Sequence, residues 1–248
     1  MTCTLSPIST TFKMPETFIY SSGSYQQYIK MVSLDYILGI SDAVYHAYGY
    51  KTKIDNASYI AQVIYELAVS KGTKLCVTDE NTMKIRREFL AEEYVMKAME
   101  GKLTQFDNVF MNILSEEKFN TFDEFNKLHK LKSYIAAFPK VYKETKERSY
   151  FNEIISQISS KSEYFGESKM RYNFKLKLIS KRYIADKGTW VINALQGDKD
   201  LITFFDSKSE IVKVEVGDIF KIRGTVIKHE YSKFTKCKET RLSRIIFS

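Results

Sequence analysis

The chain has 248 residues, 44% of them hydrophobic, with 17 Phe, 17 Tyr and one Trp, so it can bury a substantial core and is not disordered throughout. Three prolines and ten glycines exclude a collagen-like or proline-rich architecture. No apolar run reaches the roughly 18 residues that a membrane helix needs, and the first residues lack the pattern of a signal peptide. We therefore expect one or two domains, no membrane partner and a cytoplasmic location.

Metal-ligating side chains are few and far apart in this sequence. The cysteines are odd in number and form no CxxC pair, and the histidines stand at no metal-ligand spacing. We therefore expect a reducing compartment, no disulfide framework, no metal and no cofactor. The residues concerned are Cys3, Cys76, Cys237, His46, His129 and His229.

The net charge of +8 is unevenly distributed along the chain. Residues 1–166 contain 20 basic and 20 acidic side chains, whereas residues 167–248 contain 18 basic and 10 acidic ones. A neutral segment joined to a basic one predicts two units, of which the second meets a polyanion. The alternative is a solvated basic face that only aids solubility.

The first two thirds of the chain carry the hydrophobic period of helices. Residues 1–23 are rich in Ser and Thr without a clear period, which predicts a flexible arm. Residues 24–166 repeat their apolar side chains at helical spacing and are predicted to form a helical domain. The expected helices run over 56–72, from a cap at Asn81 or Thr82 to Gly101, from Thr121 to just before Pro139, and through Tyr150 to Ile158.

From Arg171 the hydrophobic period changes from 3.6 to 2, which indicates strands. Residues 167–248 hold five such runs separated by turn signals, enough for a small barrel. Gly224, inside the fourth run, suits a tight bend or a close backbone approach. The expected strands are 171–179, 189–195, 201–205, 219–227 and 238–247.

The fourth and fifth runs carry a family resemblance. Val216–Glu230, followed by Thr240–Arg244, resembles the last two strands of OB domains in phage-type replication and single-stranded-DNA-binding proteins. Gly188–Trp190 and Phe204–Phe205 are similar to strands two and three of such domains. The resemblance implies an α+β protein of two domains, with a helical N-terminal domain over 24–166 followed by a basic, five-stranded OB-fold β-barrel over 167–248. OB domains also bind RNA, oligosaccharides or proteins, so the ligand class is not fixed by the fold.

Binding of a flexible nucleic-acid strand needs cations that follow the phosphates and flat rings on which bases stack. Residues 228–238 alternate the two kinds of side chain, at the place of the loop between strands four and five of an OB barrel. The polar faces of the first and fourth strands add further cations. The predicted nucleic-acid-binding residues are Arg171, Lys175, Lys177, Trp190, Phe204, Lys221, Arg223, Lys228, Tyr231, Lys233, Phe234, Lys236, Lys238 and Arg241.

Several members of this set have an equally good structural explanation. Trp190 fits a barrel core as well as a stacking position. Phe204 and Phe205 are adjacent, so one points inward and the other outward, and the sequence does not say which. The lysines of the first strand also fit a solvated face. Tyr231 and Phe234 favour function, because apolar rings in a charged loop have no evident core to join.

Sequence motifs for catalysis are nearly absent. No nucleotide-binding loop, nucleophile elbow or HExxH motif occurs. Glu144-Thr-Lys146, with Asp123 upstream, has the ExK form of metal-dependent nucleases but stands in a charge-dense helical stretch. We therefore expect a protein that is not an enzyme and binds single-stranded DNA, with RNA left open, in viral or phage replication, recombination or transcription.

The neutral helical domain is expected to contact replication or transcription proteins, or to associate with its own copies. The location would then be the cytoplasm of a host cell if the source is viral. Two alternatives remain from other classes of protein. One is an adaptor whose OB barrel docks another protein, and the other is a metal-dependent nuclease.

Overall fold

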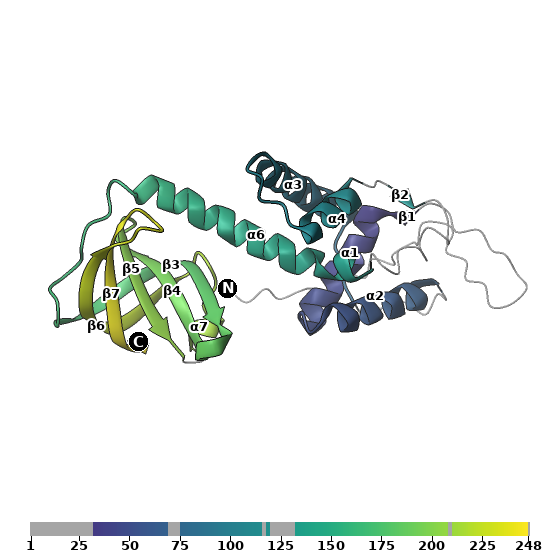
Figure 1. The fold of residues 1–248 in the computed structure, drawn as a ribbon. Helices are drawn as coiled ribbons and strands as arrows, with labels where there is room; N and C mark the ends of the chain where they lie inside the picture. Colours follow the sequence, from purple (N-terminus) through teal and green to yellow (C-terminus); the bar gives the residue numbers. More distant parts are fainter. Residues whose placement is uncertain (1–31, 69–74, 116–117, 120–131, 208–209, 248) are drawn as a thin grey trace, which may run out of the picture. The chain divides into compact units, whose positions relative to one another are not determined.

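The computed structural model describes residues 32–68, 75–115, 118–119, 132–207 and 210–247 (Figure 1). They fall into two compact units that divide between Lys143 and Glu144. The first unit is mainly helical, whereas the second holds a five-stranded sheet and the C-terminal part of helix α6 (Lys132–Ile158). The mixed α+β class is therefore confirmed. The predicted arm over residues 1–23 lies outside the described residues.

The helices of the first unit begin at side-chain caps. The Thr52 hydroxyl accepts a hydrogen bond from the Asp55 N–H at 3.1 Å, so α2 begins before the predicted residue 56. Asp79, rather than Asn81 or Thr82, caps α3, because its Oδ1 accepts the Thr82 N–H at 2.9 Å. The elements are β1 (Val32–Ser33), α1 (Leu34–Tyr48), α2 (Lys53–Ala68), α3 (Glu80–Met99), α4 (Gln105–Leu114) and β2 (Lys118–Phe119), with β1 paired to β2.

Two ion pairs join α1 to α3 beside the apolar core. The Asp35 carboxylate accepts hydrogen bonds from Arg87 Nε at 2.8 Å and Nη2 at 3.0 Å. Asp42 Oδ1 accepts one from Arg86 Nη1 at 2.7 Å. Both carboxylates belong to buried residues, and a buried charge without a partner is strongly destabilising. The pairing with arginine explains how acidic side chains occupy the buried face of α1.

Helix α6 does not end before Pro139, as the sequence predicted, but continues through it. Proline has no N–H, so the carbonyl of Ile135, four residues earlier, lacks its helical donor. The Ser41 hydroxyl of α1 donates a 2.8 Å hydrogen bond to that carbonyl. The helix therefore crosses Pro139 with the freed acceptor satisfied from a neighbouring helix. The predicted start of this helix, Thr121 to Leu131, lies outside the described residues.

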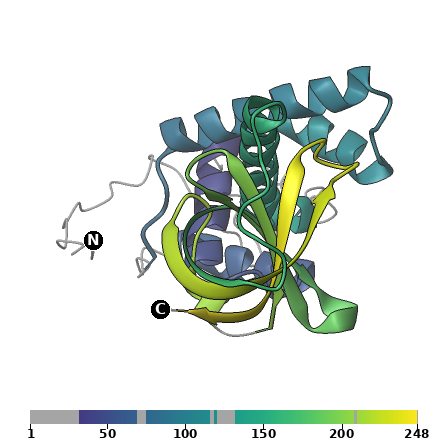
Figure 2. The same cartoon turned by 90° about the vertical axis from the view of Figure 1, so that its left-hand side faces the viewer.

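All five strands predicted from the sequence are present in the second unit. They are β3 (Arg171–Ile184), β4 (Thr189–Gln196), β5 (Asp200–Asp206), β6 (Ile219–Tyr231) and β7 (Lys238–Phe247). Their pairing follows the order β3-β4-β5-β7-β6 and closes on itself, because β3 also pairs with β6. Every pair is antiparallel except β5 with β7. In Figure 2 the strands curve around a common interior.

The interior of this sheet is filled by alternate side chains of each strand, as the period of 2 predicted. Phe174, Leu176 and Ile222 are among its buried residues. A second, smaller cluster lies on the outside, where Ile158 and neighbouring residues of α6 pack against buried side chains of the strands. The buried residues that the sheet and its adjoining loop contribute to this cluster are Ile179, Leu195, Leu201 and Cys237.

Short turns and irregularities shape the strands. Gly188 adopts the left-handed conformation after the 3₁₀ turn Ala185–Lys187, at the predicted turn between the first two strands. At Gly224 the pairing of β6 with β7 shifts, and a Cβ atom there would lie 3.1 Å from Ile245 Cδ1 and 3.3 Å from Leu242 Cδ1. Gly224 therefore stands at an irregularity of the pairing, which fits the predicted bend, and the atoms close to it belong to side chains of β7 rather than to a neighbouring backbone. The four-residue helix α7 (Glu210–Lys213) connects β5 to β6.

Candidate nucleic-acid interface

A row of cations lies on the outer face where β3 and β6 pair. Lys175 stands directly opposite Lys221, and Asn173 stands opposite Arg223. The neighbouring residues on each strand point into the apolar core, so these side chains point outward, and Lys175, Lys221 and Arg223 are exposed. Arg171 and Lys177 extend the row along β3. We call Arg171, Lys175, Lys177, Lys221 and Arg223 the cation row.

No member of the cation row forms a salt bridge with another residue that the structure describes. Arg171 Nη2 donates to the carbonyl of Arg244 at 3.2 Å, which leaves its charge uncompensated. Like charges placed directly opposite on neighbouring strands destabilise a sheet. The cations that the sequence placed on the polar faces of the first and fourth strands thus lie on paired strands, and their role in binding stays a prediction.

The connection between β6 and β7 carries the predicted rings. Its backbone is held by hydrogen bonds from Ser232 N–H to the Cys237 carbonyl at 2.9 Å and from Lys236 N–H to the Ser232 carbonyl at 2.8 Å. Phe234 is 86% exposed and Tyr231 60% exposed. Lys233 and Lys236 are exposed beside them. This connection is therefore an ordered loop with two rings open to solvent.

Three of the predicted cations near this loop are paired with carboxylates. Lys238 Nζ lies 2.7 Å from Glu163 Oε2. Lys228 and Arg241 both form ion pairs with Glu230, and Arg241 Nε also lies 3.0 Å from Glu239 Oε1. Their charges are thus partly neutralised within the protein. Glu163 comes from a distant segment, and Glu230 reaches Arg241 from the neighbouring strand. The other two pairs, Lys228 with Glu230 and Arg241 with Glu239, join residues two apart on one strand, whose side chains share a face.

The carboxyl groups of Glu230 and Glu239 face each other across β6 and β7 and share a hydrogen bond. Burial raises the pKa of Glu239, and the hydrogen bond with Glu230 raises it further. The pKa of Glu230 is lowered, first by its hydrogen bond with Lys228 and also by Glu239 and Arg241. The pair therefore holds a proton on Glu239 more readily than on Glu230.

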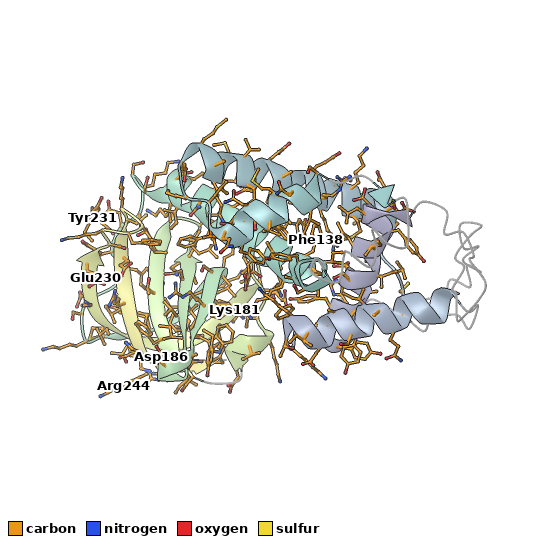
Figure 3. The ribbon with its side chains drawn as sticks, turned by 45° about the vertical axis from the view of Figure 1, so that its right-hand side comes forward. Phe138, Lys181, Asp186, Glu230, Tyr231 and Arg244 are labelled. Carbon is orange, nitrogen blue, oxygen red and sulfur yellow. The ribbon has the colours of Figure 1, made fainter. Side chains whose placement is uncertain are left out.

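The predicted residues form two groups rather than one. Lys221 and Tyr231 lie near opposite ends of β6, roughly 30 Å apart along the strand at about 3.3 Å per residue. Figure 3 shows Tyr231 and Arg244 toward opposite ends of the sheet. The cation row thus lies on one wall of the sheet, and the rings of the loop lie beyond its end. The sequence predicts that the cation row and the loop rings form one site, because their segments are close in the sequence.

The two remaining predicted rings point inward or are partly covered. Phe204 is 1% exposed and pairs with buried Ile192, so its prediction as a base-stacking residue is wrong. It shares the inward parity of Ile202 on β5, which leaves Phe205 on the outside at 48% exposure. Trp190 is partly buried and packs against the core, with the Tyr183 ring 5.1 Å away. Trp190 therefore combines a core contact with partial exposure.

Sequence reasoning missed three exposed groups. The sequence does not say whether Phe204 or Phe205 faces outward, and the burial of Phe204 shows that Phe205 is the exposed ring. Tyr164 is 40% exposed and stacks on His229 with ring centroids 4.9 Å apart, with Lys238 Nζ 5.7 Å from its ring. No sequence signal marked Tyr164, because it stands in a polar segment before the first strand. Arg244, with a φ of 51°, is exposed next to the cation row.

The ExK pattern considered for a nuclease lies on α6. Glu144 and Lys146 are two residues apart on a helix and so do not share a face. Asp123 lies outside the described residues. This pattern therefore does not assemble a site on α6.

Comparisons with known proteins give no relative for this chain. No family model matches it, and searches of curated proteins and of solved structures find no match. Within the described ranges, no helix combines the length and the apolar character needed to cross a membrane.

Proposed function

We propose that this chain is a non-enzymatic protein that binds single-stranded nucleic acid, most readily DNA, through phosphate contacts and base stacking. The binding unit would be the five-stranded sheet of residues 144–248. The cation row supplies the phosphate contacts, and Tyr231 and Phe234 supply the rings.

The strand order supports an OB-fold for this unit. An OB-fold is a five-stranded Greek-key barrel. Here the third strand, β5, pairs in parallel with the fifth, β7, and the first strand, β3, pairs with the fourth, β6. Helix α7 stands between the third and fourth strands. These features together fit an OB-fold barrel with the loop 232–237 between its fourth and fifth strands.

The observation that carries the proposal is the pairing of Lys175 with Lys221. Two ammonium groups directly opposite on neighbouring strands repel each other, at a cost of up to about 1 kcal/mol. Arg223 and Arg171 add charge of the same sign nearby. A polyanion along this face would offset the repulsion and release its own counterions. A surface that served only solubility would not need two lysines directly opposite each other on neighbouring strands.

The rings of Tyr231 and Phe234 would add base stacking to the phosphate contacts. An 86% exposed phenylalanine within an ordered loop contributes nothing to the core of the sheet. Stacking of a base on such a ring is worth about 1–3 kcal/mol and tolerates any sequence. Since the ring lies far along β6 from the cation row, we propose that a strand contacts the two groups at different nucleotides.

A role in viral or phage replication, recombination or transcription remains part of this proposal, as does a cytoplasmic location. The helical unit would contact proteins of those processes or further copies of the chain. If the sheet instead docks a protein as an adaptor, oligonucleotide binding will be weak and will show no preference for single strands.

Titration of a labelled oligonucleotide at several salt concentrations tests the proposal. The wild-type chain should prefer single strands to duplex, and its affinity should fall steeply with salt. The triple variant Lys175→Ala, Lys221→Ala, Arg223→Ala should flatten the slope of log affinity against log salt by about 2, at ~0.7 per lost phosphate contact. A matched variant with Lys187, Lys199 and Lys213 replaced by Ala removes three other exposed cations and should keep the wild-type slope. Equal slopes for the two variants would contradict the proposed interface.

A further inference from the structure

The helical unit carries stacked tyrosines on its surface. The rings of Tyr48, at the end of α1, and Tyr59, on α2, lie nearly parallel at 14° with centroids 4.8 Å apart. Tyr48 is 48% exposed although one side of its ring is covered by Tyr59. Among the described residues, no second ring and no side-chain cation stacks on the Tyr48 ring. A stacked ring with an open face is a platform on which a further flat group can stack.

Three lysines of the helical unit each lie over an aromatic ring, and one of them, Lys51, lies over Tyr59 of the stacked pair. Lys51 Nζ lies 5.6 Å from the Tyr59 ring centroid, and Lys140 Nζ lies 4.7 Å from that of Tyr50. Lys53 Nζ lies 4.9 Å from the centroid of Phe106. Each ammonium is thus positioned by a ring while its residue stays at least partly exposed. We call Tyr48, Tyr50, Lys51, Lys53, Tyr59 and Lys140 the tyrosine–lysine patch.

The backbone that presents the patch is fixed by one buried side chain. Asn56 is 2% exposed, and its Nδ2 donates to the Gly49 carbonyl at 2.9 Å. Its Oδ1 accepts the Lys51 N–H at 3.0 Å. Gly49 takes a φ of 71°, which ends α1 and turns the chain toward α2. The connection that carries Tyr50 and Lys51 is therefore ordered before any ligand arrives.

The charge of the patch is positive. Asp55 is the only acidic residue between positions 49 and 59 of the sequence. The salt bridges of the described residues include neither Lys51 nor Lys53. Cations interleaved with an open stacking platform are the combination by which proteins hold an unpaired nucleic-acid strand. An acidic peptide would use the cations but would leave the stacked rings without a matching flat group.

We infer that the tyrosine–lysine patch is a second, separate contact for single-stranded nucleic acid, on the helical unit. A base stacks on the open face of Tyr48, and Lys51 and Lys53 contact the adjoining phosphates. The identity of this ligand rests on the function proposed for the sheet, but the patch shares no residue with the cation row. Its contribution can therefore be measured separately.

The experiment titrates labelled single-stranded DNA and RNA into the full chain. It compares the wild type, the row variant (Lys175→Ala, Lys221→Ala, Arg223→Ala), the patch variant (Tyr48→Ala, Lys51→Ala, Lys53→Ala) and their combination. The patch variant should weaken binding by roughly 5- to 150-fold, the range that one stacked base supplies. The combined variant should bind more weakly than the row variant. Circular dichroism checks that each variant is folded.

Two matched controls accompany the patch variant. Tyr48→Phe keeps the ring and should bind like the wild type. Replacing Lys84 and Lys102, two exposed lysines elsewhere on the same unit, should leave affinity unchanged.

The outcomes separate this inference from the proposed function. Wild-type affinity in the patch variant, with loss of binding in the row variant, overturns the inference and leaves the function of the sheet intact. Loss of binding in the patch variant alone supports the inference and overturns the cation row as an interface. A wild-type chain that binds neither DNA nor RNA overturns both.

Discussion

The Ser41 hydroxyl donates a 2.8 Å hydrogen bond to the carbonyl of Ile135, the acceptor that Pro139 leaves without a helical donor. Ser41 is 1% exposed, so no water replaces its hydroxyl without rearrangement. Replacing Ser41 with Ala should therefore lower the free energy of unfolding by about 1–3 kcal/mol, because a buried carbonyl is left unsatisfied. Urea denaturation followed by circular dichroism measures the change.

Two variants sharpen this prediction. Ser58 donates a similar bond to the Ile54 carbonyl but is exposed, so Ser58→Ala should change stability by less than about 0.5 kcal/mol. Pro139→Ala restores an N–H four residues after Ile135, so Ser41→Ala should be less costly in that background. Equal costs of Ser41→Ala in both backgrounds would show that the hydroxyl does not compensate for the proline.

The opposed lysines of the cation row predict a conflict between stability and binding. Lys221→Glu places a carboxylate directly opposite Lys175, so it should leave stability unchanged or raise it by up to about 1 kcal/mol. The same change should weaken oligonucleotide binding, because it puts a negative charge on the phosphate-binding face. Lys199→Glu, in the exposed turn between β4 and β5, serves as the control for charge reversal alone. A less stable Lys221→Glu variant would argue that Lys221 has a structural role.

Phe204 and Phe234 should respond in opposite ways to truncation. Phe204→Ala removes a fully buried ring and should cost about 3–5 kcal/mol of stability. Phe234→Ala removes an 86% exposed ring and should cost less than about 0.5 kcal/mol, but it should reduce affinity for single strands by about 1–3 kcal/mol. Thermal denaturation and oligonucleotide titration of the two variants check both halves. An unchanged affinity in Phe234→Ala would remove the loop from the interface.

The Glu230–Glu239 pair predicts a pH dependence of stability. The pKa of Glu239 is raised by burial and by the hydrogen bond with Glu230, so the folded state retains its proton more strongly than the unfolded chain does. Stability from this group is then fully present below the ordinary glutamate value of about 4.3 and is lost as pH rises through the raised pKa. Glu239→Gln keeps an oxygen acceptor for Arg241 and removes the titration. It should therefore be more stable than the wild type at neutral pH, with a difference that shrinks as the solution is acidified.

Glu230 should show the reverse trend. Its pKa is lowered, chiefly by the hydrogen bond with Lys228, so its contribution is present above the ordinary glutamate value and is lost as pH falls. Glu230→Gln should accordingly be destabilising at neutral pH, with a smaller difference in acid. Urea denaturation of both variants across the acid-to-neutral range tests these signs. The same pH trend in both variants would contradict the assignment of the shared proton to Glu239.

Much of the second unit followed from local pattern. Alternation of Phe174 and Leu176 with Lys175 and Lys177 predicted β3 and its buried face. Gly224 predicted the irregularity at which the pairing of β6 with β7 shifts. These features depend on neighbours in the sequence, because a strand repeats every two residues and a missing Cβ acts where it stands.

Other features depended on residues distant in the sequence. The end of a helix at Pro139 was predicted from the lost N–H, but Ser41, on another helix, satisfies the freed carbonyl. Lys238 seemed free for phosphate, but Glu163 pairs with it from a segment before the sheet. Adjacent Phe204 and Phe205 were indistinguishable until the packing of β5 fixed which one faces inward.

By itself, the sequence determined that the first part of the chain is helical, where the five strands of the second part run, which strand faces are apolar and that the excess charge lies in the last third. Those properties follow from the spacing of apolar side chains and from local composition, which can be read from short stretches of the chain. Only the tertiary structure decided that Lys175 lies opposite Lys221, that the loop rings lie far along β6 from that pair, and that Tyr48 stacks on Tyr59. Such pairings arise when distant segments share a surface, because burial of the apolar face of each element fixes which of its polar side chains meet.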